Sequence, residues 1–117
     1  MRIVFDKNVP VGVRRFLTAH EVSTFVEMRW HPQLENGELV KAAEAAGFDV
    51  MVTSDQNIVY QQNLTDRKLA FVVLGSNIWP VVRDHGATIA AKVAAAAPGS
   101  YEFIEMPLPP KRRGSCG

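Results

Sequence analysis

Two stretches of this chain, FDVMVTSD at residues 48–55 and KLAFVVLG at residues 68–75, are apolar at nearly every position. A strand with one face in water alternates apolar and polar residues, whereas a strand covered on both faces is apolar throughout. Parallel strands are covered in this way because the connections between them cross the faces of the sheet. The two runs therefore predict a buried, mainly parallel sheet and favour an α/β architecture.

Strand and helix patterns alternate along the whole chain. Strands are predicted at residues 1–5, 20–26, 48–55, 68–75 and 101–106. Helical spacing is found at residues 11–19, 35–47 and 76–99, the last with Pro80 in its first turn and Pro98-Gly99 at its end. This alternation predicts a three-layer α/β/α sandwich around a five-stranded sheet with right-handed connections, and we expect the strand order 2-1-3-4-5.

Length and composition predict one domain. The chain has 117 residues, enough to bury a core without disulfides or a structural metal, and we expect residues 1–106 to form the domain and residues 107–117 a flexible basic tail. Its single cysteine, Cys116, fits a reducing cytoplasm, and no apolar run suits a signal peptide or a membrane span. The net charge of +1 gives no general electrostatic signal for nucleic acid.

Acidic residues follow the first and third predicted strands. Asp6 ends the first strand, Asp55 ends the third, and Glu38 lies in the first turn of the helix that leads into the third. With the order 2-1-3-4-5 all three lie at the edge of the sheet where ligands of open parallel sheets bind. Each acid alone also fits a turn or a helix cap, so the prediction depends on the three together.

Three carboxylates at one place repel each other, and a divalent cation relieves the repulsion. The ligands are hard oxygens without a His/Cys set, which favours Mg²⁺ or Mn²⁺ over zinc. A carboxylate-held cation with open water positions is suited to hydrolysis of a phosphodiester. Asp6, Glu38 and Asp55 are therefore the candidate metal ligands and catalytic residues of a nuclease.

The same residues carry a resemblance to a known family. FDKNVP, NGELVKAAEAAG and VMVTSDQN, within residues 1–80, resemble the PIN-like ribonuclease superfamily, in particular its short members similar to VapC-type toxins. The resemblance implies a PIN-like domain and a hydrolase that cleaves RNA with a metal-activated water. It also implies a small antitoxin as protein partner. Under it, Asp6, Glu38 and Asp55 match the metal-binding acids.

Other residues are assigned supporting or RNA-binding roles. Asn8 and Asn57 match polar positions of the family beside the acids, and Ser76 and Asn77 stand after the fourth strand, where larger PIN domains carry a fourth acid. Position 8 is Asn rather than an acid, a second departure from the family pattern. The candidates for RNA contact are Lys7, Arg14, Arg15, Tyr60 and Gln61.

Two other functions fit the same pattern. One is a flavodoxin-like phosphoacceptor signalling domain with Asp55 at the third strand's tip, although that class needs an acid pair after strand one and a Lys after strand five. The other is a non-catalytic binding module whose acids shape a polar groove. Phe25, Val26, Met28 and Trp30 form either a docking surface for an antitoxin or a homodimer, or part of the core.

Overall fold

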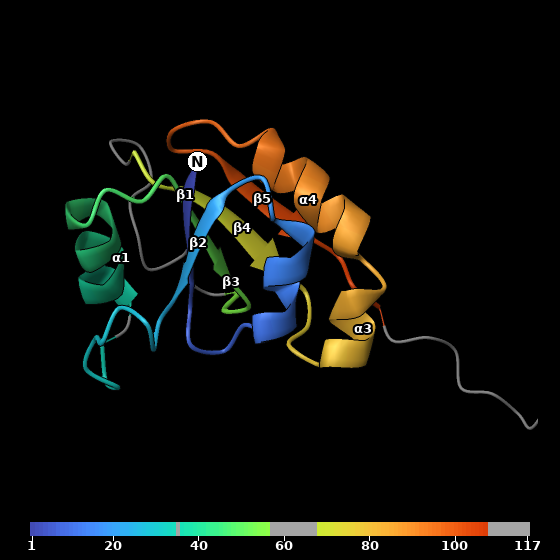
Figure 1. Cartoon of the computed structure of the whole chain (residues 1–117), viewed down its shortest axis with the longest axis horizontal. Coiled ribbons are helices and arrows are strands. Elements are labelled where there is room, and N and C mark those ends of the chain that lie inside the picture. The colour runs from blue at the N-terminus through green and yellow to red at the C-terminus, as the bar shows by residue number, and fades with distance from the viewer. Residues whose placement is uncertain (35, 57–67, 108–117) are drawn as a thin grey trace, which may run out of the picture.

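The fold is built on a five-stranded sheet in which every paired strand is parallel, with the order β2-β1-β3-β4-β5 (Figure 1). The computed structural model describes residues 1–34, 36–56 and 68–107. The strands are β1 (Arg2–Phe5), β2 (Glu21–Thr24), β3 (Val50–Thr53), β4 (Ala70–Leu74) and β5 (Tyr101–Ile104). The predicted α/β class and strand order are confirmed, and the sheet is parallel throughout rather than mainly parallel.

The register aligns the ends of β1, β2 and β3. Phe5, the last residue of β1, pairs with Thr24 of β2 and with Val52 of β3. Residues that follow β1, β2 and β3 therefore emerge at one edge of the sheet, which we call the carboxyl edge. The opposite edge, where Asp49 precedes β3 and Lys68 comes just before β4, is the amino edge.

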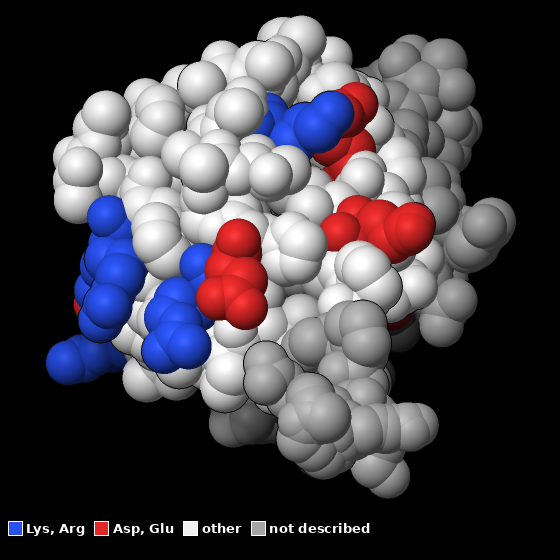
Figure 2. All heavy atoms as spheres, turned by 90° about the vertical axis from the view of Figure 1, so that its right-hand side faces the viewer, with Lys and Arg blue, Asp and Glu red and all other residues white. Residues whose placement is uncertain are grey.

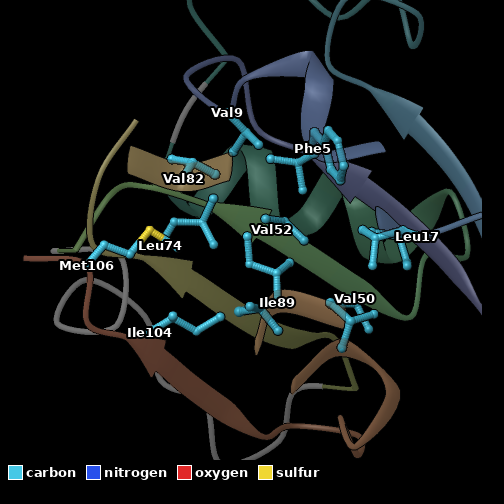
Figure 3. Close-up of a cluster of buried hydrophobic side chains, with 14 of the residues drawn as sticks. Phe5, Val9, Leu17, Val50, Val52, Leu74, Val82, Ile89, Ile104 and Met106 are labelled. Atoms are coloured by element: carbon cyan, nitrogen blue, oxygen red, sulfur yellow. The ribbon is translucent and has the colours of Figure 1, made fainter. Parts of the chain in front are cut away.

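One face of the sheet is covered by a 3₁₀ helix, η1 (Val11–Phe16), and two α-helices, α3 (Trp79–Arg83) and α4 (Gly86–Ala94). Alternate residues of the strands point to this side and form a buried cluster with these helices (Figure 3). Among its members are Phe5, Val52, Leu74, Val82 and Ile89. The period of two along each strand thus produces the core directly.

The other face is covered by α1 (Asn36–Ala45) and by the turn after β2. Strand residues Val4, Met51 and Phe71 point to this side, where the ring of Trp30 lies 5.6 Å from that of Phe25. Phe25 is buried, and Met28 and Trp30 are half-buried against the cluster, whereas Val26 is exposed. Of the two interpretations of this segment, the core interpretation fits Phe25, Met28 and Trp30.

Two of the connections have opposite hands. The connection from β1 through η1 to β2 and the connection from β4 through α3 and α4 to β5 lie on the same face of the sheet. They run in opposite directions across the sheet, because β2 and β5 are its two edge strands. The prediction of right-handed connections is therefore wrong for one of these two.

Two of the three predicted helices take a different form in the structure. The segment at residues 11–19 forms the short η1, and the single helix expected over residues 76–99 is divided at Asp84 and His85. Gly86 faces the ring of Phe16 so closely that a Cβ atom there would overlap it. The second helix, α4, therefore begins at a glycine, because only a residue without a Cβ atom lets Phe16 of η1 pack this closely. Pro80 does stand in the first turn of α3, as predicted.

A glycine follows the end of α1 at Ala45. Gly47 has φ of +83°, the left-handed conformation in which glycine is favoured after a helix. The expected tail lies largely outside the described residues, which end at residue 107. Among the described residues no helix is long and apolar enough to cross a membrane.

Candidate functional site at the carboxyl edge

Asp6 is a buried acid directly after β1, an inner strand of the sheet. Only 7% of the residue is exposed, and both oxygens of its carboxylate accept hydrogen bonds. Oδ1 accepts the backbone N–H of Lys7 at 2.7 Å, and Oδ2 accepts the hydroxyl of Thr53 at 2.8 Å. Because bonds from donors to a carboxylate are stronger than neutral ones, they offset part of the cost of burying its charge.

Thr53 connects the two acids of the neighbouring strands. Its side chain is fully buried at the end of β3, and its hydroxyl oxygen accepts the backbone N–H of Asp55 at 3.0 Å while the proton goes to Asp6. One hydroxyl thus fixes both the Asp6 carboxylate and the backbone that carries Asp55. Thr53 had no predicted role. The one feature of the sequence that could have indicated it is a hydroxyl residue at the end of an apolar strand, two residues before Asp55.

Asn8 makes a second link between the same two loops. Its side chain is half-buried, and Oδ1 accepts the backbone N–H of Ser54 at 3.3 Å. The loop after β1 is itself tight, since the N–H of Val9 donates to the carbonyl of Asp6 at 3.1 Å. The predicted supporting role of Asn8 therefore has a structural counterpart, which is to join the β1 and β3 tips.

Glu38 stands apart from this network. It lies in the first turn of α1, as predicted, and the topology puts that turn at the carboxyl edge, but its side chain is exposed. Within the described ranges, no three His, Cys, Asp or Glu side chains are grouped so that they could hold a metal ion. The structure brings Asp6 and Asp55 to adjacent strand ends and leaves Glu38 on the surface of the helix.

Of the polar residues after β4, Ser76 bonds to the backbone of its own loop and Asn77 is exposed. The Ser76 hydroxyl accepts the backbone N–H of Ile78 at 3.1 Å, and Asn77 is exposed. Neither caps α3 by a side-chain hydrogen bond. The predicted residues Asn57, Tyr60 and Gln61 lie outside the described residues.

The predicted RNA-binding cations all contact the protein itself. Lys7 Nζ donates to the carbonyl of Pro32 at 2.7 Å, and the Arg15 guanidinium lies 5.5 Å from the ring centre of Trp79. Arg14 forms an ion pair with Glu27. Figure 2, which looks onto the side of the molecule that carries α3 and α4, shows most of the blue groups together at the lower left beside a red group.

A groove of about 350 Å³ runs beside Asp6, between the tips of β1 and β2. A larger hollow of about 640 Å³ lies at the amino edge and is lined by residues that include Glu44, Asp49 and Lys68. We place the site at the smaller groove, because Asp6 lines it and because ligands of parallel sheets bind at the carboxyl edge.

Comparison with models of protein families finds no match for this chain, and comparisons with curated proteins and with solved structures find none.

Proposed function

We propose that this chain is a Mg²⁺- or Mn²⁺-dependent endoribonuclease with a PIN-like, three-layer α/β/α domain, and that it acts in the cytoplasm as the toxin of a toxin–antitoxin pair. The observation that supports it most is the buried Asp6 carboxylate, bonded through Thr53 to the backbone of Asp55. These residues lie between β1 and β3, where the strand order reverses and where ligands of such sheets bind.

The carboxylates are the donor type that a hard divalent cation prefers. Asp6 and Asp55 would hold it from adjacent strand ends, and Glu38 would join them only after moving, because the described residues do not group the three acids. Each oxygen of Asp6 accepts a single hydrogen bond from the described residues, which leaves acceptor capacity on both. Asp6 also has no ion pair with a described residue. The bound cation would supply an activated water and neutralise charge on the phosphate.

The chain's own residues hold the acids in position. Thr53 fixes the orientation of Asp6, and Asn8 holds the loop that carries Asp55. Such supporting contacts keep a ligand set in place before the cation and the substrate arrive. Glu38 would reach the cation from the first turn of α1, and its exposure leaves that side chain free of packing constraints.

A flavodoxin-like phosphoacceptor is a second candidate, because that class shares the strand order 2-1-3-4-5. Asp55 follows β3 as that function requires. However, Asp6 has no second acid beside it, and β5 is followed by Glu105 and Met106 rather than by a lysine. We therefore favour the nuclease. A non-catalytic binding module is the third possibility. Cleavage assays with metal distinguish it from the nuclease.

Cleavage of total RNA with Mn²⁺, compared with the same reaction in EDTA, tests the proposal. We expect cleavage by the wild type and a loss of about 100-fold or more in Asp6→Asn and Asp55→Asn, because each removes a metal ligand. Asp84→Asn, an equal charge change on an exposed residue of another loop, should cleave like the wild type. Normal Mn²⁺ binding without any cleavage would contradict the nuclease and favour the binding module.

The toxin role has its own test. Expression of the wild type in bacterial cells should arrest growth, and expression of Asp6→Asn to the same level should not. Equal growth of both cultures, together with cleavage by the purified wild type, would leave a nuclease that is not a toxin.

A further inference from the structure

The groove beside Asp6 joins the candidate site to the tip of β2. Its volume of about 350 Å³ lies at the lower end of the range of roughly 300–1,000 Å³ that small-molecule sites occupy. The residues that line it come from β1, η1, β2, the loop after β1 and the turn after β2, and they include Asp6, Val11, Arg14, Thr24, Val26 and Glu27. Because Asp6 is among them, a ligand in the groove would lie directly beside this acid.

Arg14 lines this groove and has hydrogen-bond donors without a partner among the described residues. Both of its hydrogen bonds to described residues start from the same nitrogen, Nη2, which donates to the carbonyl of Val22 at 3.0 Å and to the carboxylate of Glu27. The donors on Nε and Nη1 have no hydrogen-bond partner among the described residues. Nε–H and Nη1–H point to different sides of the guanidinium, so a phosphate oxygen would accept a single charge-assisted hydrogen bond from one of them.

Glu27 and Thr24 hold Arg14 in place. The N–H of Thr24 donates to Glu27 Oε1 at 3.0 Å, and the N–H of Glu27 donates to the Thr24 hydroxyl at 3.1 Å, the reciprocal pattern of a capping box. The hydrogen bond from Arg14 and the one from Thr24 lower the pKa of Glu27, so the carboxylate stays charged at neutral pH. A cation held in this way loses less conformational entropy when a ligand binds.

Two exposed valines form the apolar part of the groove. Val11 is 62% exposed and Val26 is 79% exposed, and they belong to η1 and to the turn after β2. Exposed apolar residues that line one groove mark a contact surface more strongly than isolated ones. The groove therefore has the Asp6 carboxylate, the Arg14 guanidinium and an apolar surface made by the two valines.

We propose that this groove binds one nucleotide of single-stranded RNA next to the phosphate that is cleaved, with the phosphate of that nucleotide on Arg14 and its base against Val11 and Val26. The inference rests on the proposed nuclease function and adds to it the position of the substrate. Base recognition in single-stranded RNA uses the flat faces of unstacked bases, which an apolar wall can cover. Arg14 is then a substrate-binding residue, and Glu27 positions it.

Binding in the absence of metal tests the groove separately from catalysis. The probe is a fluorescent single-stranded RNA 12-mer in EDTA, and its Kd is measured by anisotropy at one fixed salt concentration. Arg14→Gln should weaken binding about tenfold, because it removes a charge-assisted hydrogen bond to phosphate. Arg83→Gln, which removes the same charge from an exposed residue of α3 that does not line the groove, should bind within about twofold of the wild type.

Val26→Asp is the second variant, since this exposed side chain can change without loss of the fold even if Arg14→Gln unfolds. An acid at the groove should weaken binding about fivefold by repelling phosphate. Ala91→Asp on the exposed side of α4 is its control. Equal weakening by each variant and its control would overturn the inference, as would a wild type that does not bind the RNA.

The groove and the nuclease can fail independently. Selective loss of RNA binding in Arg14→Gln, in a protein that never cleaves RNA with Mn²⁺, would retain the groove and refute the nuclease. Mn²⁺-dependent cleavage with the same KM in Arg14→Gln and the wild type would retain the nuclease and refute the groove.

Discussion

The two edges of the sheet both carry acids that accept backbone hydrogen bonds, but the acids lie in different settings. At the amino edge, the carboxylate of Asp49 accepts the N–H of Arg2 at 2.8 Å, and the N–H of Asp49 donates back to the carbonyl of Arg2 at the same distance. Asp49 is exposed, so its charge remains hydrated. This acid joins the starts of β1 and β3 and has a structural role.

At the carboxyl edge, Asp6 makes a comparable pair of hydrogen bonds while almost fully buried and without an ion pair to a described residue. A buried charge without a counter-ion costs stability, whereas an exposed charge that bonds to the backbone costs little. Under the proposed function, this difference means that Asp49 serves the fold and Asp6 serves the site. Four predictions test this contrast.

The largest combined effect is expected for Thr53→Val. The change keeps the shape of the side chain but leaves Asp6 and the N–H of Asp55 without the hydroxyl, which should lower the free energy of unfolding by about 1–3 kcal/mol. Loss of the orienting contact should also reduce RNA cleavage about 10- to 100-fold. Urea unfolding and a cleavage assay measure the two effects, and Thr88→Val on the exposed side of α4 is the control. Full activity in the variant would remove Thr53 from the site.

Asp49→Ala should affect the fold alone. Loss of the carboxylate that accepts the N–H of Arg2 should lower the free energy of unfolding by about 1 kcal/mol, the usual size of one such bond. Cleavage of RNA should match that of the wild type at a temperature where both are folded. A variant with normal stability and reduced cleavage would reverse the roles assigned to the two edges.

Glu27 differs from both Asp49 and Asp6 because it forms an ion pair, with Arg14. Its folded-state pKa lies below the ordinary 4.5 because of the hydrogen bond from Arg14 and the one from Thr24. Its contribution to stability is therefore complete above the unfolded-state pKa and disappears as the pH falls through the lowered folded-state pKa. Glu27→Gln should be less stable than the wild type at neutral pH, and the gap should close in acid. A gap in unfolding free energy that stays constant with pH would contradict this.

The smallest effect on stability is expected for Asp6→Asn. Removal of a charge that is buried without a counter-ion offsets the weakened hydrogen bonds, so the metal-free variant should be as stable as the wild type or slightly more stable. Thermal unfolding in EDTA measures this. A loss above about 1 kcal/mol would show that the carboxylate serves the fold, as Asp49 does.

The sequence predicted most of the fold because its main signal was strong. Runs such as FVVL are apolar on both faces, as is typical of parallel strands that are covered on both sides. The division between α3 and α4 and the short η1 were missed, because they depend on the contact of Gly86 with Phe16, two residues that are far apart in the sequence. No periodicity within one helix reports such a contact.

The candidate site was predicted in part. The adjacent positions of the strand ends that carry Asp6 and Asp55 follow from the strand order, and the first-turn position of Glu38 follows from the helical pattern at residues 35–47. The role of Thr53 could not be predicted, since its partner Asp6 is 47 residues away in the chain. The groove was also missed, because it forms only where the turn after β2 comes against η1.

Binding of Mn²⁺ measures the central claim most directly, and it needs no RNA. The wild type should bind a single Mn²⁺ in a titration followed by electron paramagnetic resonance, and Asp49→Ala should bind it with the same affinity. Asp6→Asn should lose that binding while it remains folded. Equal Mn²⁺ affinity in Asp6→Asn and the wild type would show that the carboxyl edge does not hold the metal.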